Sequence, residues 1–301
     1  MQQQHPKTGL DTLCRLFGKS RQAFYDHSNR DSIQQLKEGV ILDAVRSVKT
    51  TVSPSIGAVK TFKIIKPALD NYKITIGRDR FYRLLRDNNL LVRPKKRRYA
   101  ITTDSNHPFR KYADLTGNLK PQRAGQLWLS DITYLRTWSG FAYLSIITDD
   151  YSRKIIGYHL SQSLSAKGSL IALDKAIASL QNTTGGLIHH SDRGIQYCCD
   201  AYVSSLQTNN IKISMTQNGS PYENALAERV NGILKTEFGL AKTFKSYSDA
   251  IAPVHRAIDV YNRLRPHMSI DYLTPASAHK ITGQLKKRWK AKTYKPCQPP
   301  K

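Results

Sequence analysis

The sequence predicts an α/β core with a mixed sheet, preceded by a basic region made only of helices. Three β-rich runs follow one another within residues 127–161, and strand patterns then alternate with helical periods. Residues 1–125 carry 25 Lys/Arg against 10 Asp/Glu, residues 126–279 carry 14 against 12, and residues 280–301 carry 8 against none. Basic segments around a near-neutral core are typical of polyanion-binding proteins, so we expect nucleic acid rather than ribosome association or a merely solvated surface.

The N-terminal residues 8–28 predict two short helices joined by a glycine-containing turn. Apolar residues recur at helical spacing from Leu10 to Phe17, Gly18 ends that helix, and Ser20 can cap the next one. The second helix presents polar side chains that suit a DNA groove or backbone: Arg21, Gln22 and Tyr25. A helix-turn-helix and an ordinary helical hairpin both fit this pattern.

Two further helical segments complete the N-terminal half. Residues 31–48 predict a separate helix with one apolar face, formed by Ile33, Leu36, Val40, Ile41 and Val45. The segment 52–92 should end in a helix that buries Phe81, Leu84 and Leu85 and exposes Arg78, Arg80, Arg83 and Arg86. We therefore expect a helix-turn-helix-like region at 1–50 and a second small DNA-binding helical region at 51–93.

Basic, proline- and glycine-containing segments flank the predicted core. Residues 94–124 are interpreted as a basic linker, which begins with the run Lys95, Lys96, Arg97 and Arg98. This run is expected to contact the DNA backbone, although a simple hinge is the alternative. Residues 280–301 form a basic tail that either binds DNA non-specifically or keeps the chain soluble.

The predicted core, residues 125–279, has five strands and several helices. LWLSDITYL, FAYLSIITDD and KIIGYHLSQS should pair as an antiparallel meander, with GLIHH and IKISMT as later strands. Helices are expected at 167–181, in CDAYVSSLQTNN, and at about 222–239 and 247–263. This order gives a sheet with mixed strand directions and flanking helices.

Three acids occupy positions that suit metal binding. Asp131 lies inside an apolar strand, Asp192 directly follows a buried strand, and Glu228 lies in a helix, separated from Asp192 by 35 residues. Glu228 shares one helix face with Asn224, Asn231 and Lys235. Two strand-borne aspartates and a helix-borne glutamate can converge on a pair of divalent cations that cut and join phosphodiester bonds. Periodicity does not decide which face of the strand carries Asp131.

Several motifs carry a resemblance to a known family. They read LWLSDITYL, YLSIITDDYSRKIIGYHLS, HHSDRGIQY, SMTQNGSPYENALAERVNGILKTE and YNRLRPHMSI, and they span about 125–278. The N-terminal LCRLFGKSRQAFYDH and RFYRLLRDNNLLVRPKKRRY match more loosely. The chain resembles the integrase-like transposases of the second-reading-frame (OrfB) type in bacterial insertion sequences, which belong to the DDE superfamily. Glu223 departs from the usual Asp, and the Tyr-Gly-Tyr-Arg-Arg pattern of the N-terminal region is missing.

The resemblance implies the fold and the chemistry. The core would be ribonuclease-H-like, and Asp131, Asp192 and Glu228 would be the catalytic acids that bind two Mg²⁺ ions, which Mn²⁺ can replace. The reaction would be cleavage at the 3′ ends of an insertion sequence followed by strand transfer. Lys235, Asn231 and Arg193 are expected to contact DNA near the cut. The alternatives are a catalytically silent DNA-binding repressor of the same element and a simple nuclease.

The resemblance also implies partners. These are the terminal inverted repeats, the target DNA, a homo-oligomer that is at least a dimer, and an upstream-frame helix-turn-helix protein. We expect no membrane association, because no run of 18 apolar residues occurs. The four dispersed cysteines fit a reducing setting, and a cytoplasmic, nucleoid-associated protein is expected.

Three smaller clusters have competing interpretations. His189, His190, Cys198 and Cys199 do not have zinc-site spacing, because neighbouring strand residues point to opposite faces. Asp149 and Asp150 are expected to cap a turn and pair with Arg153 rather than join a metal site. Arg263, Arg265 and His267 either complement a helix dipole or support the active site or DNA, and the sequence leaves both open.

Overall fold

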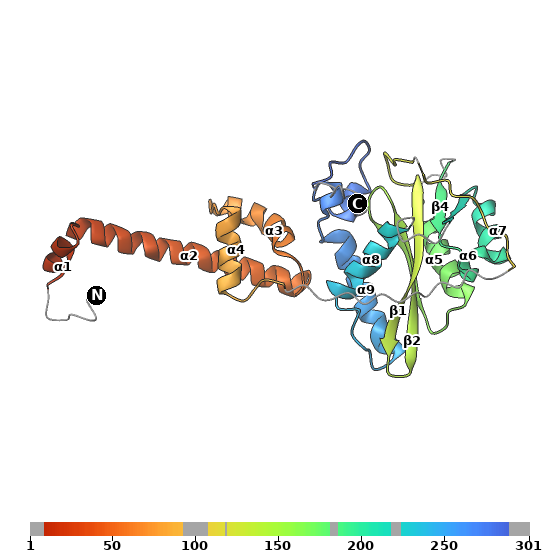
Figure 1. Ribbon diagram of the computed structural model, residues 1–301, viewed down its shortest axis with the longest axis horizontal. Coiled ribbons are helices and arrows are strands. Elements are labelled where there is room, and N and C mark those ends of the chain that lie inside the picture. Colours follow the sequence, from red (N-terminus) through yellow and green to blue (C-terminus); the bar gives the residue numbers. More distant parts are fainter. Residues whose placement is uncertain (1–8, 93–107, 118, 181–185, 218–223, 289–301) are drawn as a thin grey trace, which may run out of the picture. The chain divides into compact units, whose positions relative to one another are not determined.

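The structure, a computed structural model, describes residues 9–92, 108–117, 119–180, 186–217 and 224–288 (Figure 1). The chain divides into two compact units: one comprises Met1–Thr51 with Gly57–Val92, and the other comprises Val52–Ile56 with Arg93–Lys301. We refer to the first as the helical unit and to the second, after the catalytic core that the sequence predicts, as the catalytic unit. The division into five segments expected from the sequence remains a prediction.

The helical unit contains α1 (Leu10–Leu16), α2 (Arg21–Thr51), α3 (Ala58–Asn71) and α4 (Arg78–Asp87). The turn between α1 and α2 agrees with the prediction, since Gly18 has a φ of +65° and the Ser20 hydroxyl accepts the Ala23 N–H at 3.1 Å. The separate helix predicted at 31–48 is wrong, because α2 is continuous. Its polar stretch keeps helical contacts, such as the 3.0 Å bond from the Ser32 hydroxyl to the Ser28 carbonyl.

The core of the helical unit lies against the C-terminal half of α2. That helix buries Ile41, Val45 and Val48, and α4 buries Phe81, Leu84 and Leu85 as predicted. The four α4 arginines are exposed, also as predicted. The common apolar face predicted for α2 is wrong in part, because Ile33, Leu36 and Val40 are 53%, 72% and 40% exposed. All buried residues of α2 lie beyond these three, at Ile41, Val45 and Val48.

The catalytic unit is built on a five-stranded mixed sheet, which confirms the predicted fold class. Its strands are β1 (Leu127–Thr137), β2 (Gly140–Asp149), β3 (Ile155–Ser161), β4 (Ile188–Ser191) and β5 (Lys212–Met215). Their order is β3-β2-β1-β4-β5. The first three strands pair antiparallel, whereas β4 pairs parallel with both β1 and β5. The predicted meander and the two later strands are therefore confirmed.

Helices cover both faces of the sheet (Figure 1). They are α5 (Ala166–Ala178), α6 (Ile195–Cys198), α7 (Asp200–Thr208), α8 (Ala225–Thr236), α9 (Tyr247–Arg263) and α10 (Pro275–Ala278), with a 3₁₀ turn at Met268–Ile270. Among the described residues, every helix is too short or too polar to serve as a transmembrane span.

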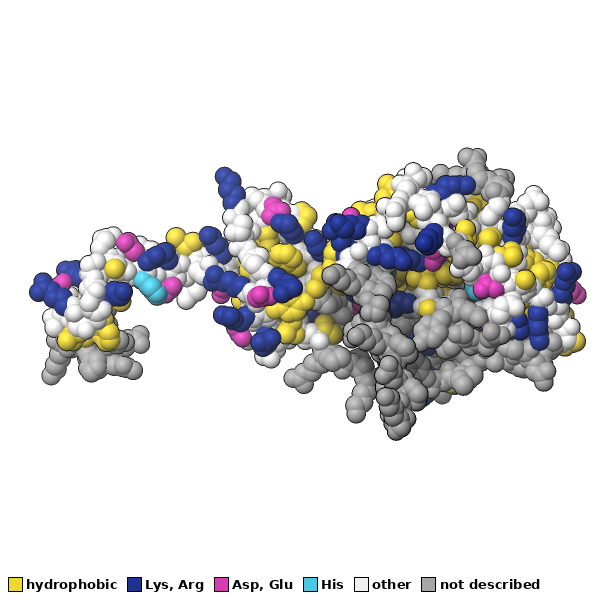
Figure 2. Space-filling model, turned by 45° about the horizontal axis from the view of Figure 1, so that its top comes forward, with side chains coloured by type: hydrophobic (Ala, Val, Ile, Leu, Met, Phe, Trp, Pro, Cys, Tyr) yellow, Lys and Arg dark blue, Asp and Glu magenta, His cyan; other side chains and the backbone are white. Residues whose placement is uncertain are grey.

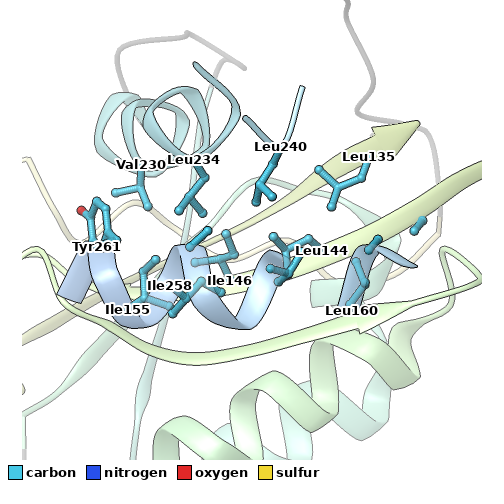
Figure 3. Packing of buried hydrophobic residues seen from close by; sticks show 14 of the residues in the cluster. Leu135, Leu144, Ile146, Ile155, Leu160, Val230, Leu234, Leu240, Ile258 and Tyr261 are labelled. Carbon is cyan, nitrogen blue, oxygen red and sulfur yellow. The ribbon is translucent and has the colours of Figure 1, made fainter. Parts of the chain in front are cut away.

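Alternation along β1 decides what each face of the sheet contacts. Leu135 packs with residues of β2, α8 and α9 in the cluster of Figure 3, and Leu127 and Leu129 pack with Ala227 of α8. Trp128 packs on the opposite face with α5, α6 and α7. Because strand residues alternate between faces, the odd positions of β1, Asp131 among them, point towards α8. The structure thus settles the sidedness that periodicity left open.

Close packing on the α5 face requires a glycine. A Cβ atom on Gly157 of β3 would stand 2.1 Å from the Ala172 carbonyl oxygen of α5 and 2.9 Å from the Ala176 Cβ. Such distances are far below van der Waals contact, so any side chain here would push α5 away from the sheet.

The described part of the predicted linker packs on the catalytic unit. Phe109 and Tyr112 contact the apolar cluster around Trp128, and the Leu115 N–H donates to the Ser214 hydroxyl of β5 at 2.8 Å. The run 95–98 lies outside the described residues, so its predicted DNA contacts stay a prediction.

Candidate active site

The three predicted acids come from three neighbouring elements. Asp131 lies in the middle of β1, Asp192 directly follows β4, and Glu228 lies in the first turn of α8. In the parallel pair of β1 and β4, Leu129 stands opposite His190. Two residues further along both strands, the same register brings Asp131 and Asp192 to one level and one face.

The acids influence one another electrostatically. The pKa of Asp131 is raised to about 7, first by burial and then by the charge of Asp192, with a smaller contribution from Glu228. Hydrogen bonds from Asn231 and from the Ile132 N–H oppose this rise. Three carboxylates in one partly buried place repel one another, and a cation or a proton relieves that repulsion.

The face of α8 predicted from helical spacing does point at β1. The Asn231 amide donates to Asp131 Oδ2 at 2.6 Å, and the Asn224 amide donates to the Ser130 carbonyl at 3.1 Å. Both asparagines are buried. Asn231 therefore orients the Asp131 carboxylate, a contact that the sequence did not predict. Its predicted DNA contact stays a prediction.

Lys235 lies on the same helix face and is partly buried. Burial lowers the pKa of its ammonium group, while the charge of Asp131 opposes that change. The lysine is thus within electrostatic reach of the acids, as helical spacing predicts for a residue seven positions after Glu228.

A tight turn fixes Asp192. The Gly194 N–H donates to Asp192 Oδ1 at 3.0 Å, and a Cβ atom on Gly194 would stand 3.0 Å from that same oxygen and from Gln196 Oε1. Gln196 in turn donates to the Leu164 carbonyl at 3.0 Å. The Asp-Arg-Gly turn therefore needs glycine so that the backbone can approach the carboxylate.

Two buried histidines lie beneath the acids in separate hydrogen-bond networks. His189 Nε2 contacts the Ser130 hydroxyl at 2.6 Å and the Tyr202 hydroxyl at 3.0 Å, whereas His190 Nδ1 contacts the Ser214 hydroxyl at 2.8 Å. Burial lowers the pKa of His189 to about 3, so its imidazole is neutral in the folded protein. Paired histidines at the end of a buried strand were the only sequence signal for these networks.

The cluster at the end of α9 supports the helix that carries Glu228. Arg265 is 2% exposed and donates Nε and Nη2 to the Glu237 carboxylate, both at 2.8 Å, just after the C-terminus of α8. His267 Nε2 lies 2.9 Å from Arg265 Nη1. By contrast, Arg263 is exposed and pairs with Asp259 at 2.7 Å. The structure thus favours active-site support for Arg265 and His267, and the sequence missed Glu237, the partner of Arg265.

Asp149 and Asp150 have the turn-capping role expected from the sequence. Asp149 Oδ1 accepts the Ser152 N–H at 2.8 Å and the Ser152 hydroxyl at 2.6 Å. Asp150 pairs with Arg153 at 2.7 Å. Both carboxylates are therefore occupied by the β2–β3 turn.

The donor chemistry of the site fits a divalent cation. Carboxylate oxygens are the preferred ligands of Mg²⁺. Burial raises the pKa of Asp131, and the charges of Asp192 and Glu228 add to that rise, so a nearby cation would favour the ionised carboxylate. Within the described residues, however, no three His, Cys, Asp or Glu side chains are grouped closely enough to hold an ion together.

The remaining residues predicted to contact DNA lie on different elements of the chain. Arg21 and Gln22 are exposed at the start of α2, and Gln22 donates to Asp26 at 2.9 Å. Arg193 is partly buried beside Asp192. Lys and Arg side chains stand out along the helical unit on the face that Figure 2 shows. This surface suits a polyanion, and the individual contacts stay predictions.

Comparisons with known proteins show the family of the chain. Integrase core domain models match residues 121–221 and 209–275. The 31 kDa protein of insertion element IS600 from Shigella sonnei is 31% identical over 91% of this chain and 99% of its own. The transposase of insertion sequence element IS904 from Lactococcus lactis is 29% identical over 84% of this chain and 99% of its own.

Among solved structures, the HTLV-2 integrase catalytic core domain in complex with magnesium covers 53% of this chain and 99% of its own, with a TM-score of 0.42 and 18% identity. The family matches span the five-stranded unit and all three acids. The IS600 match, which covers almost both chains, extends through the helical unit as well. The chain belongs to the bacterial insertion-sequence transposases, a family of polynucleotidyl transferases with an integrase core domain.

Proposed function

We propose that this transposase cuts and joins DNA with Asp131, Asp192 and Glu228 as its catalytic acids and Mg²⁺ as its cofactor. The observation that carries the proposal is the convergence of the three carboxylates from β1, β4 and α8, whose charges add to burial in raising the pKa of Asp131 to about 7. In a pocket of acids, a divalent cation replaces the proton that Asp131 would otherwise take up.

We propose separate roles for the acids and for Asn231. Asp131 and Asp192 would hold the cation first, and Glu228 would close the ligand set. When bound, Mg²⁺ supplies the charge stabilisation that phosphodiester cleavage and transfer need. Asn231 orients the Asp131 carboxylate through its 2.6 Å hydrogen bond, so a ligand oxygen is positioned before the cation arrives.

Lys235 would contact the terminal phosphate. Its ammonium group lies within electrostatic reach of Asp131. A phosphate group bound near the acids would therefore also lie near the ammonium group of Lys235. In strand transfer, the 3′-hydroxyl oxygen forms a bond to phosphorus while a second phosphorus–oxygen bond breaks, so the number of phosphodiesters is conserved and no nucleotide cofactor is needed.

The partners follow from the reaction and from the charge. A formal net charge of +25 fits DNA as the substrate. Synapsis of two terminal inverted repeats requires at least two copies of the chain, which we propose act with target DNA and with an upstream-frame helix-turn-helix protein. Reconstitution with and without that protein would test the last point.

Product analysis tests the proposed reaction. The purified chain is incubated with labelled terminal-repeat DNA and a plasmid target in Mg²⁺, Mn²⁺ or EDTA. We expect 3′-end cleavage and joined products in both cations and neither in EDTA. Cleavage without joining would identify a simple nuclease, whereas binding without either product would identify a repressor, and each result would refute the proposal.

A further inference from the structure

Unpartnered buried polar atoms gather around the three acids. Among the described residues, four such atoms belong to side chains next to the acids: the Ser191 hydroxyl, the Tyr197 hydroxyl, Asn224 Oδ1 and Asn231 Oδ1. Others, such as Thr148 Oγ1, Arg153 Nε and His189 Nδ1, belong to β2, the β2–β3 turn and β4. Ser191 precedes Asp192, Tyr197 follows it by one turn, and the two asparagines flank Glu228 on α8. A buried polar group without a partner destabilises the fold. Those beside the acids are available to hydrogen-bond with groups that a loaded site would bring or reorient.

Tyr197 departs most clearly from the rest of the catalytic unit. It is 3% exposed, and its ring packs edge-on against Tyr202 at 5.4 Å between centroids. The other tyrosines buried to this degree all have hydroxyl partners. Tyr151 donates to the Gly283 carbonyl at 2.9 Å, Tyr202 contacts His189 at 3.0 Å, and Tyr261 donates to the Arg153 carbonyl at 3.0 Å. Burial alone therefore does not explain why the Tyr197 hydroxyl has no hydrogen-bond partner.

The carboxylates of Asp192 and Asp131 affect the pKa of this hydroxyl. Burial raises the pKa of Tyr197 well above its ordinary value, and the charges of Asp192 and Asp131 raise it further. The phenol therefore stays protonated and remains a hydrogen-bond donor. Of the two carboxylates, Asp192 has the larger effect and already accepts the Gly194 N–H on Oδ1.

We infer that the Tyr197 hydroxyl is a positioning group that donates to the Asp192 carboxylate when Asp192 binds a divalent cation. The inference rests on the proposed function, because it assumes that Asp192 is a ligand. Carboxylates that bind a metal are usually oriented by an outer hydrogen bond, whose loss typically weakens binding about 10- to 100-fold. Without the cation the hydroxyl has no partner, so it does not stabilise the metal-free fold.

The competing explanation is that Tyr197 only fills space in the aromatic cluster with His189 and Tyr202. Phenylalanine would then serve equally well with and without metal. Tyr197→Phe removes only the oxygen and separates the two explanations. Tyr202→Phe is the matched control, because it deletes a buried hydroxyl that has a partner in the metal-free structure.

The experiment compares both variants with the wild-type full-length chain. Thermal unfolding is measured in EDTA, and Mn²⁺ binding is measured by electron paramagnetic resonance of the free ion. For Tyr197→Phe we expect an unchanged or higher melting temperature in EDTA and a Mn²⁺ affinity about 10- to 100-fold weaker. The Mg²⁺ concentration that half-saturates joining should rise in parallel, with activity recovered at high Mg²⁺. Tyr202→Phe should melt lower and bind Mn²⁺ within about 2-fold of wild type.

Two results would overturn the inference alone. One is equal Mn²⁺ affinity in Tyr197→Phe and wild type, and the other is a lower melting temperature of Tyr197→Phe in EDTA, which would reveal a structural partner. In both cases the wild-type chain would still join DNA, so the proposed function would stand. A wild-type chain that binds no cation and joins no DNA would overturn the proposed function together with the inference.

Discussion

Replacing Arg265 with methionine should destabilise the catalytic unit strongly. The guanidinium group is 2% exposed and makes two 2.8 Å hydrogen bonds to Glu237, whose side chain is 17% exposed. Removing one member of a buried ion pair typically lowers the free energy of unfolding by about 3–5 kcal/mol, because the other charge stays buried without a partner. Since Glu237 retains some contact with water, we expect about 3 kcal/mol.

Differential scanning calorimetry of the full-length chain checks this value. For a unit of about 200 residues, 3 kcal/mol corresponds to a fall of roughly 6–12 °C in the melting temperature of the catalytic unit. Arg263→Met is the matched control, because Arg263 pairs with Asp259 at the surface, where an ion pair contributes at most about 1 kcal/mol.

A second variant identifies the physical cause. If the loss arises from the uncompensated Glu237 charge, the double variant Arg265→Met/Glu237→Leu should recover most of the stability, since an apolar pair can replace a buried ion pair with little loss. The reasoning is refuted if Arg265→Met melts no lower than Arg263→Met. It is also refuted if the double variant is less stable than Arg265→Met.

Three further outcomes are expected. Asn231→Ala removes the hydrogen-bond donor to Asp131 and should reduce the yield of joining, normalised to the amount of DNA bound, about 10- to 100-fold. An unchanged normalised yield would contradict the orienting role. The pKa of His189 is about 3 in the folded protein and 6.5 in the unfolded chain, so the unfolded chain is protonated first as the pH falls. The free energy of unfolding should therefore decrease below pH 6.5, by about 2 kcal/mol at pH 5. Urea unfolding at pH 7 and 5 should show that His189→Gln loses less stability across this interval than wild type, and an equal loss would refute the assignment. Gly157→Val should lower stability by at least about 1–3 kcal/mol through overlap with α5, whereas Gly232→Ala, with open space around its Cβ, should raise it by about 0.5–1 kcal/mol; urea midpoints would expose any reversal of this order.

Much of the catalytic unit could be predicted because its local signals agree with its tertiary structure. The β-rich runs, the turn at Asp149 and the helical period around Glu228 each specify one element. The face shared by Glu228, Asn231 and Lys235 follows from helix geometry alone. These local rules therefore gave both the order of the strands in the chain and the side of α8 that meets the acids.

Contacts between distant residues could not be predicted in the same way. The pairing of Arg265 with Glu237 joins residues 28 positions apart, and the contact of Asn231 with Asp131 joins residues 100 apart. No periodicity encodes such pairs. The side of β1 that carries Asp131 also depended on which helices cover each face of the sheet.

In the helical unit, local sequence signals predict a helix boundary and a buried face that the structure does not have. The sequence predicts one helix within residues 8–28 and a separate helix at 31–48, yet α2 continues through the polar stretch around Ser28. A polar composition does not end a helix in the absence of glycine or proline. The apolar period at Ile33 and Leu36 predicted burial, but burial needs a partner element, which the described residues do not provide there.

The central claim is that three particular carboxylates perform the joining reaction. The most direct measurement is the yield of strand transfer for Asp131→Asn, Asp192→Asn and Glu228→Gln, each normalised to the amount of DNA bound. Asp200→Asn, an exposed acid of α7, is the control. Because the cation contributes several kcal/mol, each of the three variants should join at least about 1000-fold less than wild type, with Asp200→Asn unchanged. A variant among the three that retains more than about a tenth of wild-type joining would contradict the claim.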